Sequence, residues 1–134
     1  MPIISWDPKL ATGDSVVDHQ HKTLFQMVNE LHDAITAGKA KEHLQKVLER
    51  LASYTLEHFA AEERLMGRSG YPGVAEHVRK HHDLAKKATD LIEGYRSGKL
   101  VLSLTLSQFL ADWVRHHIAE EDQKMIAWIQ TRPK

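Results

Sequence analysis

The sequence predicts an all-α protein: an antiparallel, up-down-up-down four-helix bundle with an extended N-terminal arm and a short C-terminal helix. Four stretches repeat apolar residues every three or four positions, which is the pattern of an amphipathic helix. The segments between them are short, and short connections place successive helices antiparallel. The chain has 134 residues, enough to bury one core, so we expect residues 1–134 to form a single domain.

Residues 1–17 are predicted to form the arm, because they contain Pro2 and Pro8 and show little periodicity. Trp6 is expected to pack against the bundle. Three residues could cap the first helix: Asp14, Ser15 and Asp18.

The helices are expected to end where glycine or proline interrupts the apolar pattern. Gly38 follows the first helix, and Pro72 stands in a glycine-containing segment where it could open the third. The predicted helices cover residues 18–37, 41–66, 73–95 and 103–122, and the C-terminal helix covers residues 124–130.

Composition excludes several classes of function. The 18 basic and 18 acidic residues give a net charge of zero, which provides no electrostatic basis for binding nucleic acid or an anionic membrane. The absence of cysteine excludes disulfides, thiolate ligands and a thiol nucleophile. Neither a signal peptide nor an apolar run of membrane length is recognisable, so we expect a cytoplasmic protein without membrane insertion. The unusual feature is the count of 10 histidines.

Two pairs of potential ligands are four residues apart: His58 with Glu62, and His77 with His81. On a helix each pair points in one direction, one turn apart, and each lies in line with an apolar stripe. One such pair can arise by chance, and a single histidine on an apolar face is more often a hydrogen-bonded core residue than a ligand.

The bundle topology makes the set more informative than any pair. In antiparallel helices, the start of one helix lies level with the end of the next. Candidate ligands at the starts of helices one and three and at the ends of helices two and four therefore share one level. They are His21, His58, Glu62, His77, His81, His117 and Asp122. Burying so many polar groups without partners is costly, so a metal centre is predicted. The remaining histidines are interpreted as surface residues: His19, His32, His43, His82 and His116.

Seven ligands are too many for one ion and suit two. Two octahedral iron ions need twelve positions. Five histidines, two bridging carboxylates and one bridging oxygen from water fill eleven, which leaves one for a small molecule. Neither the Glu-x-x-His motif of ferritin-like di-iron proteins nor the His-Glu-x-x-His motif of zinc proteases is present.

The whole pattern resembles the hemerythrin family, specifically the single-domain bacterial hemerythrins. The resemblance covers nearly the whole chain and rests on Gln20-His21-Lys22 with Leu24-Phe25, His58-Phe59-x-x-Glu62-Glu63 with Met66, Gly70-Tyr71, His77-x-x-x-His81, and Trp113-x-x-x-His117-Ile118-x-x-x-Asp122. It implies a non-heme di-iron centre that binds O₂ reversibly. It also implies that His77, His81 and His117 bind one iron, that His21 and His58 bind the other, and that Glu62 and Asp122 bridge them.

Two positions fit the resemblance less directly. His117 and Asp122 are five residues apart, about 140° around a regular helix, so helical geometry alone favours Glu121. The family pattern favours Asp122, and we expect a local distortion or a helix end there. Met125 stands where the family often has tyrosine, which concerns packing beside the site.

The resemblance implies a monomeric O₂-binding protein for storage, transport or delivery to an oxygen-consuming enzyme, and not an enzyme itself. An oxygen, redox or iron sensor is the alternative, and a di-iron enzyme acting on peroxide or nitric oxide is a third. The carrier is favoured because no residues remain for a signalling domain. Five apolar residues at the level of the ligands are expected to form the O₂ pocket: Leu24, Phe59, Trp113, Val114 and Ile118.

Overall fold

The computed structural model describes residues 3–98 and 104–131 and is helical through most of them. The arm contains one 3₁₀ turn, Pro8–Leu10. The helices are α1 (Ser15–Thr36), α2 (Lys41–Ser69), α3 (Val74–Arg96), α4 (Leu104–His117) and α5 (Gln123–Thr131), with a π-helical turn (Ile118–Asp122) between the last two. The expected first residue of the fourth helix, Ser103, lies outside the described residues.

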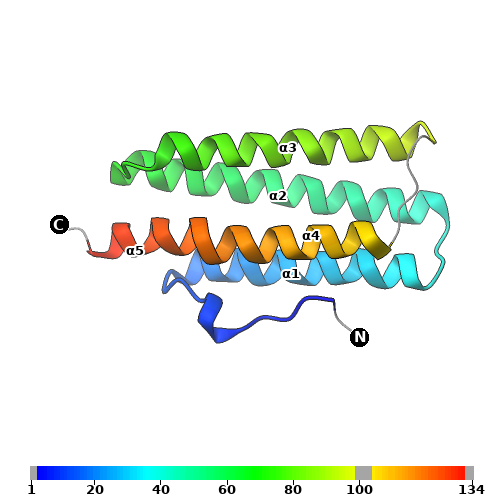
Figure 1. Cartoon of the computed structure of the whole chain (residues 1–134), viewed down its shortest axis with the longest axis horizontal. Helices are drawn as coiled ribbons and strands as arrows, with labels where there is room; N and C mark the ends of the chain where they lie inside the picture. Colours follow the sequence, from blue (N-terminus) through cyan, green and yellow to red (C-terminus); the bar gives the residue numbers. More distant parts are fainter. Residues whose placement is uncertain (1–2, 99–103, 132–134) are drawn as a thin grey trace.

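Four long rods lie side by side, and the arm runs along α1 (Figure 1). Helix α1 contacts α2 and α4, and α2 also contacts α3. Successive rods run in opposite directions, so the predicted four-helix bundle with its arm is confirmed. The expected short C-terminal helix is present as α5, and α4, the π turn and α5 form one continuous rod (Figure 1).

The arm is fastened to the bundle by one aromatic contact and by hydrogen bonds. The ring of Trp6 meets that of Phe25 edge-on, with the centroids 5.5 Å apart, as the sequence predicted. Of the three candidate caps, Asp14 is the one that accepts from Val16 N–H and Val17 N–H, so α1 begins three residues earlier than expected. Asp18 instead accepts from the backbone and hydroxyl of Thr12 in the arm.

Helix α2 continues three residues beyond its predicted end at Met66. A glycine inside a helix costs only about 1 kcal/mol, so Gly67 does not stop it. The helix ends at Gly70, which adopts a φ of 69° and donates its N–H to the Met66 carbonyl. Such a left-handed residue is the usual glycine stop signal.

Apolar side chains form two clusters with the candidate ligands between them. The larger cluster fills most of the bundle and includes Val28 and Leu31, both fully buried. The smaller cluster joins the end of α2 to α5 and consists of Val17, Met66, Tyr71, Met125 and Ile126. Among the described residues, no helix has the length and apolar character needed to cross a membrane.

Candidate metal centre

The structure brings all seven predicted ligands together in the interior. Each is between 0 and 5% exposed. Helix α1 supplies His21, α2 supplies His58 and Glu62, and α3 supplies His77 and His81. His117 ends α4, and Asp122 ends the π turn.

The seven side chains form two overlapping groups, and within each group the potential ligand atoms lie within 4.8 Å of one another. One group contains the histidines of α3 and α4, and the other contains those of α1 and α2. Glu62 and Asp122 belong to both groups. This division matches the ligand sets that the resemblance implied.

The carboxylate of Glu62 faces both groups, with one oxygen toward each. Its Oε2 lies 3.6 Å from Nε2 of His21 and 3.3 Å from Nε2 of His58. Its Oε1 lies 3.5 Å from Nε2 of His77 and 3.1 Å from Nε2 of His81. Glu62 therefore has the orientation of a group that could bridge two ions.

Asp122 is arranged in the same way on the opposite side. Its Oδ2 lies 2.8 Å from Nε2 of His21 and 3.9 Å from Nε2 of His58. Its Oδ1 lies 3.0 Å from Nε2 of His77 and 3.1 Å from Nε2 of His117. Two carboxylates thus each offer one oxygen to each group of histidines.

The π turn explains how Asp122 reaches the centre. Gln123 N–H donates to the Ile118 carbonyl, five residues earlier, which widens the turn by one residue. His117 and Asp122 consequently share one side of the rod. Glu121 instead points outward, where it forms an ion pair with Lys80 of α3. The expected distortion is therefore present between His117 and Asp122.

Metal ions fit this donor set because its facing polar atoms are left without hydrogen bonds. Eleven buried side-chain nitrogen and oxygen atoms of the seven residues make no hydrogen bond within the described part of the chain. They include Nε2 of every one of the five histidines and all four carboxylate oxygens. Unsatisfied buried polar atoms are rare and costly. Imidazole nitrogen together with carboxylate oxygen is a donor set that suits divalent transition metals.

Without metal, the same groups shift one another's pKa values. Burial by itself lowers the pKa of His58, but the Asp122 and Glu62 carboxylates outweigh it and raise the pKa to about 9. The pKa of His77 is likewise raised to about 9. Burial raises the pKa values of Glu62 and Asp122, and the charge of Asp122 raises that of Glu62 further, yet the surrounding histidines hold both pKa values well below their usual range. The carboxylates are therefore ionised, and metal binding must displace protons from histidine.

Two residues that the sequence analysis did not assign orient the ligands from behind. His58 donates Nδ1–H to Oε1 of Gln20 at 2.6 Å, and His81 donates Nδ1–H to Oε2 of Glu63 at 3.1 Å. Each bond leaves Nε2 facing the centre. Their places in the sequence could have indicated these two residues, because Gln20 directly precedes His21 and Glu63 directly follows Glu62.

Aromatic rings also pack against the ligands. Phe59 stacks on His81 with the centroids 3.8 Å apart, and Trp113 stacks on His117 at 4.8 Å. These contacts limit rotation of the two imidazoles.

The other histidines lie outside the centre, as predicted. His19, His43, His82 and His116 are exposed. His32 is half-buried, and its Nδ1 lies 2.8 Å from Oγ of Ser107. That contact joins α1 to α4 far from the ligands.

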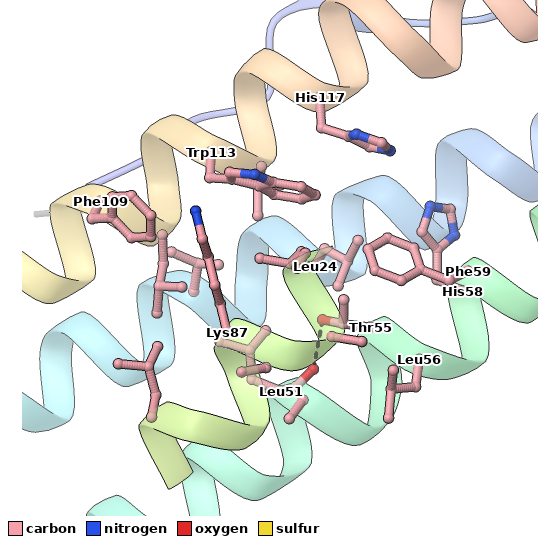
Figure 2. Close-up of a pocket in the computed structure, with 18 of the residues that line it drawn as sticks. Leu24, Leu51, Thr55, Leu56, His58, Phe59, Lys87, Phe109, Trp113 and His117 are labelled. Carbon is pink, nitrogen blue, oxygen red and sulfur yellow. Dashed lines mark hydrogen bonds between the residues drawn. The ribbon is translucent and has the colours of Figure 1, made fainter. Parts of the chain in front are cut away.

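A cavity of about 50 Å³ extends from the centre among α1, α2, α3 and α4. His58, His117 and Asp122 line its inner end. Its walls are largely apolar and include all five residues that the sequence analysis expected to form the O₂ pocket: Leu24, Phe59, Trp113, Val114 and Ile118. Figure 2 shows the rings of Phe59 and Trp113 between the helices.

Apart from the predicted ligands at its inner end, the polar groups along this cavity are hydrogen-bonded or lie at its edge. The hydroxyl of Thr55 donates to the Leu51 carbonyl at 2.7 Å (Figure 2). Lys87 is exposed, and its Nζ lies 5.7 Å from the centroid of the Phe109 ring. Away from the predicted ligands the cavity wall is therefore apolar, and an apolar wall offers water few partners.

Comparisons with known proteins agree with this geometry. The sequence profile described as the hemerythrin HHE cation binding domain matches residues 12–129. A bacteriohemerythrin of Methylococcus capsulatus is 33% identical over 124 residues, which cover 92% of this chain and 94% of that protein. A bacteriohemerythrin of Pseudomonas aeruginosa is 35% identical over 122 residues, which cover 91% of this chain and 78% of that protein.

Solved structures show the same arrangement of helices. The crystal structure of wild-type hemerythrin superimposes with a TM-score of 0.88 at 31% identity, over 96% of this chain and 98% of that one. The crystal structure of a hemerythrin mutant gives a TM-score of 0.91 at 31% identity, over 98% of this chain and all of that one.

Proposed function

Because the chain belongs to the hemerythrin family, we propose that its buried centre holds two iron ions and binds O₂ reversibly, as an oxygen carrier or store. The observation that supports this most directly is the set of unsatisfied donor atoms in two groups that share two carboxylates. A pair of iron ions held there would supply the two electrons that O₂ takes up on binding and returns on release.

The two groups have different numbers of donors. His77, His81 and His117 would hold one iron with the shared carboxylates, and His21 and His58 would hold the other. Octahedral iron has six positions, so the group with two histidines is the one that can leave a position for O₂. The apolar cavity reaches His58 of this group as well as His117 of the other, and exposed Leu56 and Phe109 also line it, so it offers O₂ a route from the protein surface.

Reversible binding requires that water and acidic protons stay away from the bound gas. Phe59 is 4% exposed and Ile118 is 1% exposed, and both line the cavity beside the ligands. Neither these residues nor Leu24, Trp113 and Val114 carry an acidic proton. A dry apolar wall controls the access of solvent to a metal, which favours release of O₂ over oxidation of the iron.

The direct test is to load the protein with ferrous iron without air and to measure iron content and visible absorption. We expect about two irons per chain, absorption bands that appear with O₂, and loss of those bands under inert gas over repeated cycles. One zinc per chain and no iron would exclude the proposed centre. Consumption of O₂ with accumulation of hydrogen peroxide would indicate an oxidase instead.

The role of the cavity can be tested separately from metal binding. Phe59→Ser or Trp113→Ser should keep two irons but speed oxidation to the O₂-inert diferric form, because either change admits water. Trp128→Ser is a matched control, since Trp128 packs against Tyr71 away from the cavity. Stopped-flow absorbance after mixing with oxygenated buffer follows both steps. Equal oxidation rates in all the variants would show that the cavity wall does not protect bound O₂.

A further inference from the structure

Two neighbouring carboxylates could occupy the same place in the centre. On an uninterrupted α-helix, Glu121 lies four residues after His117 and only about 40° away from it around the axis, whereas Asp122 lies about 140° away. A regular helix would therefore bring Glu121 toward the site and turn Asp122 aside. The structure has the opposite arrangement, and it requires a π turn.

Turns of this kind are rare, so interactions of the surrounding side chains must hold one in place. The histidines around Asp122 provide one such interaction from the inside. The ion pair between Glu121 and Lys80 of α3 lies on the outside, where it keeps the Glu121 carboxylate away from those histidines. The side chain of Glu121 is 17% exposed and that of Lys80 is 37% exposed, so solvent screens the pair only in part.

The position of Lys80 suits this role. It lies immediately before His81 on α3, while Glu121 lies immediately before Asp122. The ion pair between Lys80 and Glu121 therefore holds the Glu121 carboxylate outside the centre, against a helix that supplies two of the predicted ligands. Glu76, another acid near Lys80, is paired with Arg79 at 2.8 Å, which leaves Lys80 to Glu121.

We propose that Lys80 is a positioning residue that selects Asp122 over Glu121 as the shared carboxylate, by holding Glu121 outside the centre. This selection rests on the di-iron centre proposed above. Lys80 touches neither the ligands' metal-facing atoms nor the cavity walls near His58; it acts through Glu121. Without it, a half-buried carboxylate beside Asp122 would be free to compete for the same position.

An ordinary salt bridge predicts a different pattern of mutant effects. If the pair only stabilises the fold, removing either partner should weaken the centre equally. If Lys80 restrains a competitor, removing Lys80 should be harmful, whereas removing the charge of Glu121 should be nearly harmless. Glu121→Gln should then also rescue the loss of Lys80.

The test uses the full chain loaded anaerobically with ferrous iron and challenged with a chelator. We expect Lys80→Met to lose iron about tenfold faster or more, the size of effect typical for groups behind a ligand. Glu121→Gln should stay within about twofold of the parent, and Lys80→Met with Glu121→Gln should return close to it. Lys80→Arg should restore the pair. Arg79→Met is the control, because it removes a neighbouring cation that does not contact the π turn.

Absorption spectra and metal-free unfolding complete the test. Lys80→Met should change the diferric absorption spectrum, while the two single variants should unfold at similar urea concentrations without metal. Equal iron loss in both single variants with no rescue in the double variant would identify an ordinary salt bridge. Iron retention in Lys80→Met equal to that of the parent would also overturn the proposed role of Lys80. If the parent protein binds no iron, the proposed function is overturned, and the proposed role of Lys80 falls with it.

Discussion

In the half of the bundle around Leu31, the side chains that meet are apolar, whereas in the half around Asp122 they are ionisable. Both residues are 0% exposed, so burial alone does not distinguish the two regions. Polar groups of the apolar half have partners of their own, such as Ser107 with His32 and the Tyr95 hydroxyl with the Lys41 carbonyl, so this half is complete as a folded core. The ionisable half contains the eleven atoms without hydrogen bonds. One half therefore folds by packing alone, and we expect the other to depend on a bound metal to offset the cost of burial.

Metal removal should produce the largest difference between the halves. When free metal exceeds its Kd by about 1,000-fold, binding stabilises the fold by about 4 kcal/mol, so the metal-free protein should be less stable by at least this amount. Hydrogen exchange should accelerate around Glu62 and the π turn, while amides near Leu31 stay protected. Exchange measured by mass spectrometry with and without chelator checks this. A uniform acceleration along all four helices would show that the halves are one unit.

The next largest effect is expected from removal of a shared ligand. Glu62→Ala removes a carboxylate that faces both groups of histidines, so both irons should be lost or loosened and stability should fall. His58→Ala should also damage the centre. His82→Ala is the control, because His82 is exposed beside the ligand His81. The iron content of the three purified variants tests this expectation, and equal content in all three would contradict the predicted ligands.

A cavity in the apolar half should destabilise the protein without affecting the metal. Leu31→Ala is expected to cost about 2–5 kcal/mol, the usual range for a buried leucine, in both the loaded and the metal-free protein. Leu56→Ala should cost about 0.5 kcal/mol or less, because Leu56 is 50% exposed. Urea unfolding measures both, together with iron content. Loss of iron in Leu31→Ala would mean that the apolar half also shapes the centre.

The smallest effect on stability is expected from a change of one pH unit. In the metal-free protein the pKa values of His58 and His77 are raised to about 9, so their stabilisation is complete below pH 6.5 and is lost as pH rises through 9. Each proton contributes at most about 1.4 kcal/mol per pH unit. In the loaded protein, iron retention should instead improve over this range, because fewer protons compete for the histidines. Parallel pH dependence of the two forms would contradict these shifts.

Much of this organisation could be predicted because it depends on regular spacing. Helical periodicity and short connections specify the bundle, and the bundle places His21, His58, His77 and His117 at one level. Their role as iron ligands stays a prediction. The continuation of α2 past Gly67 could not be predicted, because a single glycine only weakens a helix and does not end it.

The π turn shows the limit of such reasoning most clearly. Local helix geometry favours Glu121, and only the family pattern indicated Asp122. The contacts that hold Asp122 inward and Glu121 outward come from α1 and α3, which are distant in sequence. The hydrogen bonds that Gln20 and Glu63 accept could not be predicted from local sequence either, because each depends on how two helices pack.

The distribution of the ligands over all four helices also affects the order of events during synthesis. Asp122 follows His21 by 101 residues. At a translation rate of about 5–20 residues per second, His21 emerges roughly 5–20 seconds earlier. Until Asp122 emerges, the growing chain lacks a carboxylate that both groups of histidines share. A nascent chain therefore has no complete site for either ion, and we expect the metal to be acquired by a bundle that is almost finished.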